Sequence, residues 1–427
     1  MKQLYRMRRL LWVWALAFPV ALQAATGDDA VLTAKRAYDR GEQAQLAKLR
    51  EALRGHELEP YVEYWLLGLR LQEAEIDEVR AFLARHAGSY LAERLRGEWL
   101  KVLGQRGEWE TFETEYPPLL EADREVHCYA LQNRLRRADP GALDEARPLW
   151  FAAAELPQAC VPLMERLIAD GRLGGDDIWE RMRRLLEAKK LGEAKRVAAY
   201  LPAGTAPSAK ALEAIADKPL RHLALLAPNF AASRLGREMA LYAVQRLART
   251  DPLQAARQLD RIEDKLSAAE RGYLYGQLGW QAALKHLPEA TAWYALAGDA
   301  PLSEEQRAWK ARAALRAQDW AMVYEAIGQM PQAMQARPEW TYWLARATAS
   351  LGRPEEARVL YARIAGQPNF YGNLADDELG RPIVLPPQMR KPSAEEVGAV
   401  AALPGMRRAL ALFRLDLRSE AVREWNW

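Results

Sequence analysis

The chain has 427 residues, of which 50% are hydrophobic and 27% are charged. This length and composition indicate a soluble, globular protein with enough apolar residues for a large core. Lys and Arg exceed Asp and Glu by only three residues, 60 against 57, so the charge gives no reason to expect nucleic acid as a partner.

The first 25 residues have the three parts of a signal peptide. Basic residues between positions 2 and 9 precede a short apolar run at 10–18, and Ala21, Ala24 and Ala25 supply small residues near a cleavage point. The apolar run is too short to span a membrane, and no later window approaches about 18 uncharged apolar residues. We therefore expect export without a retained transmembrane anchor.

Export affects the interpretation of the two cysteines, Cys128 and Cys160. In an oxidising compartment a disulfide is favoured over two free thiols. His127 precedes Cys128, but neighbours on a helix point about 100° apart, so adjacency does not place the imidazole against the sulfur. The sequence therefore predicts a structural disulfide rather than a Cys/His nucleophile.

The exported part has the sequence pattern of an all-α protein. Apolar residues recur three and four positions apart, as at 91–102, 340–347 and 357–364, and strands are not evident. Short breaks carrying Gly, Pro or Asp, at 104–107, 191–192, 286–288, 318–319 and 351–354, predict antiparallel helical hairpins. The strings KKLGEA, KHLPEA, AQDWAM and GRPEEA each place an alanine early in the next helix, where it would allow close approach of a partner.

These hairpins recur at the spacing of two-helix repeats. Ala290, Ala321 and Ala357 are 31 and 36 positions apart, which is typical of solenoids. The segment 340–366 is close to the tetratricopeptide pattern. We predict an irregular α-solenoid of tetratricopeptide-like hairpins that forms a curved, U-shaped or ring-shaped superhelix with a concave surface for partners.

The C-terminal segment begins another helical hairpin. A helical run from Met406 is followed by a second amphipathic run that starts at Glu420 and ends at Trp427 after about two turns, which is short for a stable helix. The expected hydrophobic face is formed by five residues: Leu410, Phe413, Leu417, Val422 and Trp425. We expect this hairpin to be frayed or held only by the solenoid, with fast hydrogen exchange from about residue 420, and the chain to be the front part of a longer protein.

Motifs that carry chemistry are scarce. The sequence contains no Gly-rich phosphate loop, no HExxH and no Cys-x-x-Cys, and its five histidines lie far apart. We expect no cofactor and no metal. Carboxylates cluster in the first turns of helices and on exposed faces, where solvation and the helix dipole explain them. The 15 tryptophans fit repeat packing better than sugar platforms, although an exposed one in a groove could stack on a saccharide ring.

Three segments resemble one known family. Residues 79–116 look like the opening helices of the soluble lytic murein transglycosylases, 340–382 are similar to the end of that family's U-shaped helical domain, and 400–425 resemble the start of its linker domain. The family-signature residues, expected to be structural, are Phe370, Tyr371, Gly372, Leu374, Ala375, Leu379 and Gly380. The implied organisation is a signal peptide at 1–25, a superhelical U-domain at 26–382, a Pro-rich connector at 383–392 and an incomplete linker domain at 393–427.

The resemblance implies a periplasmic enzyme that cleaves the bond between N-acetylmuramic acid and N-acetylglucosamine in peptidoglycan and leaves a 1,6-anhydromuramoyl end. In the family a C-terminal lysozyme-like domain carries the chemistry, with the Glu of a Glu-Ser motif as acid and then base. This sequence has no Glu-Ser dipeptide, so no catalytic residue is carried over and the catalytic domain is an expected partner. The family's disulfide also falls in the region of Cys128 and Cys160.

Two functions follow from the sequence. The favoured one is the non-catalytic superhelical part of a lytic transglycosylase, with peptidoglycan glycan strands as partner. The alternative is an exported tetratricopeptide-like scaffold that binds envelope proteins. The C-terminal hairpin distinguishes them, because a natural solenoid ends in a capping helix with a polar outer face.

Overall fold

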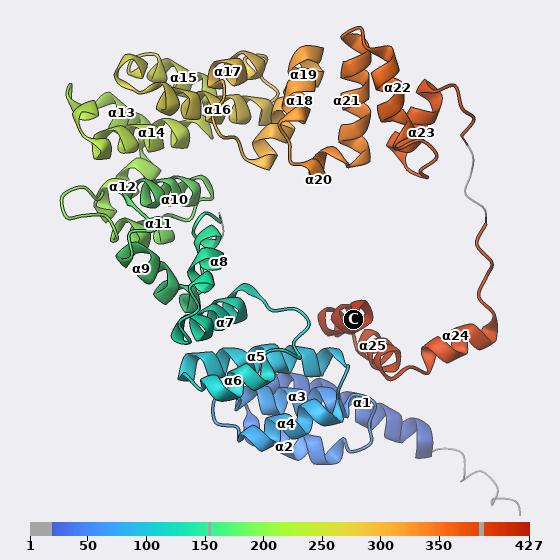
Figure 1. Cartoon of the computed structure of the whole chain (residues 1–427). Helices are drawn as coiled ribbons and strands as arrows, with labels where there is room; N and C mark the ends of the chain where they lie inside the picture. The colour runs from blue at the N-terminus through green and yellow to red at the C-terminus, as the bar shows by residue number, and fades with distance from the viewer. Residues whose placement is uncertain (1–18, 153–154, 384–387) are drawn as a thin grey trace, which may run out of the picture. The chain divides into compact units, whose positions relative to one another are not determined.

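A computed structural model describes residues 19–152, 155–383 and 388–427, with side chains from residue 27 onward. The signal peptide predicted at 1–25 therefore lies mostly outside the described residues. Every regular element in the described part is a helix (Figure 1), which confirms the all-α prediction. Within that part, no helix is both long enough and apolar enough to span a bilayer.

The chain divides into two compact units. Of the described residues, unit 1 comprises 19–150, 156–172 and 390–427, and unit 2 comprises 151–152, 155, 173–383 and 388–389. The helices of unit 1 are α1 (Pro19–Asp39), α2 (Gln43–Ala52), α3 (Glu59–Leu69), α4 (Ile76–Arg85), α5 (Tyr90–Arg106), α6 (Trp109–Glu115), α7 (Arg124–Arg136), α8 (Gly141–Trp150), η1 (Gln158–Cys160), α9 (Val161–Ala169), α24 (Ala394–Ala401), α25 (Pro404–Arg414) and α26 (Arg418–Asn426).

The helices of unit 2 are α10 (Gly175–Glu187), α11 (Leu191–Ala198), α12 (Ala209–Asp217), α13 (Pro219–Ala224), η2 (Phe230–Ala232), α14 (Arg234–Ala248), α15 (Pro252–Leu259), η3 (Glu263–Lys265), α16 (Ala268–Leu284), α17 (Ala290–Ala297), α18 (Glu304–Ala317), α19 (Trp320–Gly328), α20 (Gln332–Gln335), α21 (Pro338–Ser350), α22 (Pro354–Ala362) and α23 (Phe370–Glu378). The domain boundaries predicted from the sequence remain predictions.

The core of unit 1 joins the first helices to the last ones. Leu91 and Leu95 of the predicted apolar stripe on α5 are fully buried there. Ala411, Leu412 and Ala421, from α25 and α26, belong to the same continuous core. The C-terminal hairpin is thus held by the helices at the start of the chain.

The break predicted at 104–107 is partly wrong. Helix α5 continues through Gly104 to Arg106 and is capped by Gly107, which has a left-handed φ of 73°. A Cβ at Gly104 would lie 2.3 Å from the ring of Tyr129 on α7. Glycine at 104 therefore allows two helices to approach closely, and glycine at 107 ends the helix.

Consecutive hairpins of unit 2 pack against one another, from α14 and α15 through α16 and α17, α18 and α19, to α21 and α22. This arrangement confirms the solenoid of helical hairpins. Ala290 and Ala357 are buried, as predicted for close helix approach. Ala321 is exposed instead, because Asp319 caps α19 in a register that turns Val323 into the core.

Candidate functional site

The family-signature residues form the helix that packs on the last hairpin of unit 2. Asn369 caps α23, and its side-chain oxygen accepts a hydrogen bond of 2.9 Å from the N–H of Gly372. A Cβ at Gly372 would lie 2.3 Å from the carbonyl oxygen of Gln367, so glycine is required there. Ala375 is fully buried.

The other signature residues divide between core, surface and helix end. Tyr371, Leu374 and Leu379 pack against the same small core as Ala375. Phe370 is 69% exposed, and Gly380 follows the helix with a φ of 67°. This set packs α23 against α21 and α22 and contains no carboxyl or imidazole group, which agrees with the structural role expected for it.

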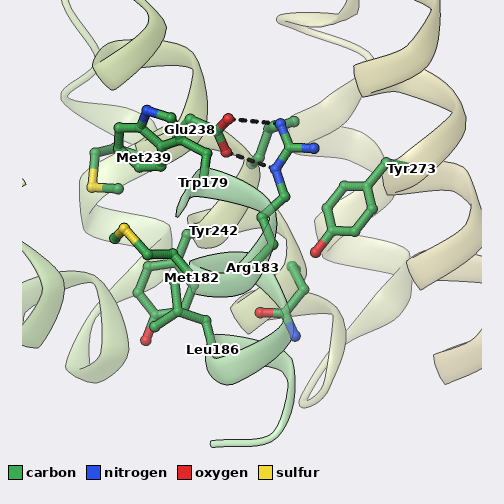
Figure 2. A pocket seen from close by; sticks show the side chains of 10 residues that line it. Trp179, Met182, Arg183, Leu186, Glu238, Met239, Tyr242 and Tyr273 are labelled. Atoms are coloured by element: carbon green, nitrogen blue, oxygen red, sulfur yellow. Dashed lines mark hydrogen bonds and ion pairs between the residues drawn. The ribbon is translucent and has the colours of Figure 1, made fainter. Parts of the chain in front are cut away.

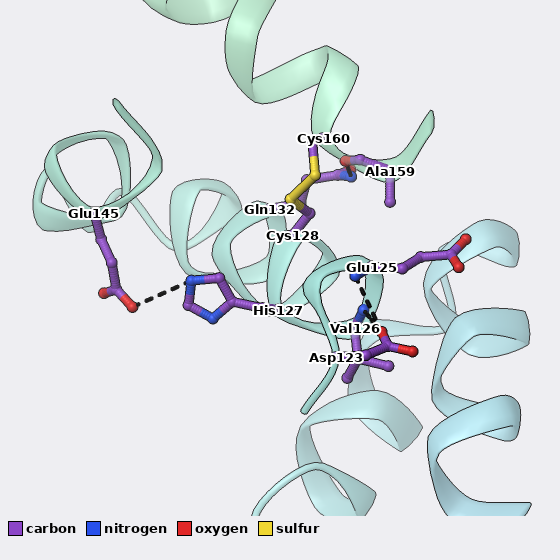
Figure 3. The surroundings of a disulfide bond; sticks show 9 residues. All are labelled: Asp123, Glu125, Val126, His127, Cys128, Gln132, Glu145, Ala159 and Cys160. Carbon is purple, nitrogen blue, oxygen red and sulfur yellow. Dashed lines mark hydrogen bonds and ion pairs between the residues drawn. A yellow bond between two sulfur atoms is a disulfide. The ribbon is translucent and has the colours of Figure 1, made fainter. Parts of the chain in front are cut away.

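The two cysteines form a disulfide that joins α7 to η1 (Figure 3). The Cys128–Cys160 bond has an S–S distance of 2.02 Å, and both residues are fully buried. Nearby, the Gln132 amide donates to the carbonyl of Ala159 at 2.6 Å. His127 points toward Glu145 instead, with 3.5 Å between imidazole and carboxylate. The sulfur and the imidazole therefore do not form a nucleophilic pair.

A small cavity of unit 2 lies among α10, α14 and α16 (Figure 2). Arg183 donates two hydrogen bonds of 2.7 Å to Glu238, and its guanidinium stacks on Tyr273 at 5.3 Å. Burial raises the pKa of Glu187, which accepts a 2.6 Å hydrogen bond from Tyr273. A glycosidase acid also has a raised pKa, but this cavity of about 10 Å³ has room for one water molecule and not for a sugar.

Metal ligation has no candidate in the described residues, where no three His, Cys, Asp or Glu side chains gather as a metal site requires.

A cluster of three polar residues fixes the C-terminal hairpin to the N-terminal helices. Glu424 of α26 is 4% exposed. Its carboxylate accepts hydrogen bonds of 2.8 Å from the Tyr61 hydroxyl and 2.7 Å from Arg408. Burial, together with the Glu424 charge, raises the pKa of the Tyr61 phenol, so Tyr61 remains a donor. Three polar groups from α3, α25 and α26 thus satisfy one another's need for hydrogen-bond partners.

Further contacts fix the two ends of this hairpin. Arg414 pairs with Asp28 on α1 at 3.2 Å. The indole N–H of Trp427 donates to the carbonyl of Gly88 at 3.1 Å, and its ring lies edge-on to Tyr90 at 6.4 Å. The hairpin is therefore packed on the first helices of unit 1, and we expect slower hydrogen exchange from residue 420 onward than a frayed hairpin would have.

The hydrophobic face predicted for this hairpin is wrong. Ala409, Ala411, Leu412 and Ala421 make the buried face, where the three alanines let the helices approach closely, and Glu424 is buried with its two partners. Of the predicted residues, Leu417 packs partly against the core. The others are exposed by these fractions: Leu410 46%, Phe413 37%, Val422 46% and Trp425 53%.

These four exposed residues, which we call the 410–425 face, form an apolar surface on two adjacent helices. The rings of Phe413 and Trp425 meet edge to face at 6.4 Å, so the two helices contribute to one patch. Large exposed apolar patches are candidate interaction sites. The 410–425 face is the candidate functional site of this chain.

Comparison with solved structures identifies proteins with a similar helical fold. An inactive mutant of the lytic transglycosylase Slt from Pseudomonas aeruginosa matches 93% of this chain with a TM-score of 0.62 and 27% sequence identity. The chain is similar to the soluble lytic transglycosylases. The 70-kDa soluble lytic transglycosylase from Escherichia coli matches 94% of the chain with 22% identity and a TM-score of 0.55, and with 0.53 in its complex with bulgecin A.

The match is uneven in its coverage. It includes nearly all of this chain but 65% of the length of each lytic transglycosylase, which agrees with a likeness to the N-terminal part of these enzymes. No family model and no curated protein matches the chain. Because the match to the Pseudomonas aeruginosa enzyme covers 93% of this chain, the likeness to lytic transglycosylases includes residues of both units.

Proposed function

We propose that this chain is the non-catalytic superhelical part of a periplasmic lytic transglycosylase, which cleaves the bond between N-acetylmuramic acid and N-acetylglucosamine in peptidoglycan during cell-wall turnover. The observation that carries the proposal is the match to the Pseudomonas aeruginosa enzyme, at 27% identity over 93% of this chain but 65% of that enzyme. The signal-peptide pattern at 1–25 supports export to the periplasm.

The role of the chain in this proposal is to hold and position a catalytic domain. A glycosidase needs a carboxyl group of raised pKa in a cleft that binds and distorts a sugar, and the sequence has no Glu-Ser dipeptide to supply the family's acid. The 410–425 face offers a docking surface for such a domain. Its counterpart is expected to present apolar side chains, since burial of these four residues would drive association.

The test is to add a purified lysozyme-like catalytic domain of a lytic transglycosylase to the exported chain and to measure anhydro-muropeptide release from peptidoglycan. The chain alone should release none. With the domain present, the chain should bind it and raise the rate of release, and the double variant Val422→Ser, Trp425→Ser should lose both effects.

The matched control is Leu120→Ser, because Leu120 is also a large apolar residue of unit 1 and is 72% exposed, but lies on the segment between α6 and α7. This variant should behave as the wild type. Release of anhydro-muropeptides by the chain alone would place the chemistry in this chain. A chain that neither binds the domain nor changes its rate would favour the exported scaffold that binds envelope proteins.

A further inference from the structure

A cation on α18 is held between two tryptophan rings. The guanidinium of Arg312 lies 5.1 Å from the ring centre of Trp309, one turn earlier on α18, and 5.2 Å from that of Trp340 on α21. Trp340 is buried, Trp309 is partly exposed and Arg312 is exposed. The two rings restrict the arginine side chain while its edge remains accessible to solvent.

Arg312 differs from other stacked arginines of unit 2 in having no counter-charge. Arg183 stacks on Tyr273 and pairs with Glu238. Arg353 stacks on Tyr324 at 4.4 Å and pairs with Glu356 at 3.5 Å. Within the described chain, no carboxylate lies within ion-pair distance of Arg312.

A second cation lies one turn further along the same helix. Arg316 donates to Nδ1 of His286, and the His286 ring lies edge-on to that of Trp309 at 6.4 Å. Arg312 and Arg316 are two like charges at positions i and i+4, an arrangement that disfavours the helix. Glu305, the acid in line with them on α18, lies about 10 Å from Arg312 along the axis.

We propose that this cationic-aromatic patch, formed by Arg312, Arg316, Trp309 and His286, binds a carboxylate of the peptide stems carried by peptidoglycan. The inference rests on the proposed function and names the part of the polymer that this surface recognises. A carboxylate accepts two parallel hydrogen bonds from one guanidinium fork. It also offsets the repulsion between the two arginines, and the partly exposed face of Trp309 can contact the sugar or an apolar side chain beside it.

Stacking favours this use of Arg312. A free arginine loses side-chain entropy when it binds a ligand, whereas Arg312 is already restricted by the two indoles. The alternative is that Arg312 only shields the buried Trp340 from water, as long cationic side chains often do. The two roles differ in their dependence on charge, because shielding needs the methylene stem and binding needs the guanidinium.

The experiment measures binding of the whole exported chain to labelled, uncrosslinked glycan fragments that carry peptide stems, by fluorescence anisotropy at low and high salt. Four probes are compared: stems with free carboxylates, stems with amidated carboxylates, glycan without stems, and a glutamate oligomer without glycan. Arg312→Met keeps an apolar cover over Trp340 and removes the charge. Arg353→Met is the matched control, since Arg353 is also stacked but already paired.

We expect Arg312→Met and amidation each to weaken binding about tenfold or more, the effect of losing one charge-assisted hydrogen bond pair. Arg353→Met should stay within about twofold of the wild type, and high salt should weaken the wild type most.

Several outcomes would overturn the proposal: no binding of the free-carboxylate probe, equal affinity of the amidated probe, or equal affinity of Arg312→Met, which would leave Arg312 as a cover for Trp340. Equal binding of a glutamate oligomer without glycan would assign the patch to acidic peptides instead. None of these results bears on whether the chain docks a catalytic domain, so the two proposals fail independently.

Discussion

Glu424 connects the two ends of the chain through a buried charge. The Tyr61 hydroxyl and the Arg408 guanidinium are its partners, at 2.8 Å and 2.7 Å, and the Arg408 side chain is only 12% exposed. Removing one member of such a buried group leaves the others without partners, which costs more than the interaction itself stabilises.

Glu424→Ala should therefore destabilise unit 1 by about 3 to 5 kcal/mol, because the Arg408 charge stays buried and unpaired. Tyr61→Phe removes one hydrogen bond to a charged group and should cost about 1.5 to 3 kcal/mol. Urea titration measures the loss of unfolding free energy in both variants, and hydrogen exchange shows whether α3 and α26 lose protection. If Glu424→Ala costs no more than Tyr61→Phe, the buried charge does not hold the hairpin.

Glu63 provides a pH dependence that can be tested. A 2.9 Å hydrogen bond with His86 lowers the pKa of the Glu63 carboxyl, with help from Arg85 and Arg50. A lowered pKa in the folded state stabilises the protein above the ordinary carboxyl pKa, and this contribution is lost as the pH falls through the lowered value.

Glu63→Gln should accordingly be less stable than the wild type near pH 7, and the difference in unfolding free energy should shrink as the pH falls below about 4. The control is Glu110→Gln, on the exposed side of α6, which should lower the stability near pH 7 by less than Glu63→Gln does. A difference that stays constant from pH 7 to pH 3 would show that the Glu63 charge is not responsible.

At the scale of single helices, two glycines of α5 have opposite surroundings. A Cβ at Gly104 would lie 2.3 Å from the Tyr129 ring, whereas a Cβ at Gly97 would lie 3.8 Å from Leu119, an ordinary contact. Neither glycine has a positive φ, so the difference between them is one of space.

Gly104→Ala should destabilise unit 1 by about 1 to 3 kcal/mol through overpacking. Gly97→Ala, in the same helix, should be neutral or stabilising by up to about 1 kcal/mol, because alanine favours the helix. Thermal unfolding of the two variants side by side provides the comparison. Equal melting temperatures would mean that α5 and α7 can separate at no cost.

Sequence periodicity predicted the helices well and their buried faces less well. The stripe at 91–102 is buried because long apolar side chains at helical spacing need a partner surface. In the C-terminal hairpin the same rule selected Leu410, Phe413, Val422 and Trp425, whereas the structure buries alanines and a glutamate. Periodicity could not show this, because Tyr61, the partner that makes burial of Glu424 possible, lies 363 positions away.

The stacked arginine was missed for a similar reason. Trp309 and Arg312 are one turn apart and could be paired from the sequence, but Trp340 reaches the same guanidinium from α21. The lack of a counter-charge is likewise a property of the folded surface. The signature residues at 370–380, by contrast, are close in sequence, and they lie on α23 or directly after it.

At the scale of the whole molecule, unit 1 is built from both ends of the chain and unit 2 from the residues between them. We expect slow hydrogen exchange in α26, comparable with that of α3. Glu424→Ala should make α25 and α26 exchange fast while α14 in unit 2 keeps its protection. Fast exchange of 418–427 in the wild type would contradict the packing of this hairpin.

The distribution of unit 1 over the two ends of the chain also sets the order in which it can fold. During synthesis the helices up to residue 150 are complete long before α25 and α26 exist, and their shared core then lacks Leu412 and Ala421. Completing that core closes a loop that includes all of unit 2, and contacts so distant in sequence form slowly. Until α26 has been synthesised, Tyr61 and its apolar neighbours remain an exposed surface of the nascent chain, which a chaperone could recognise.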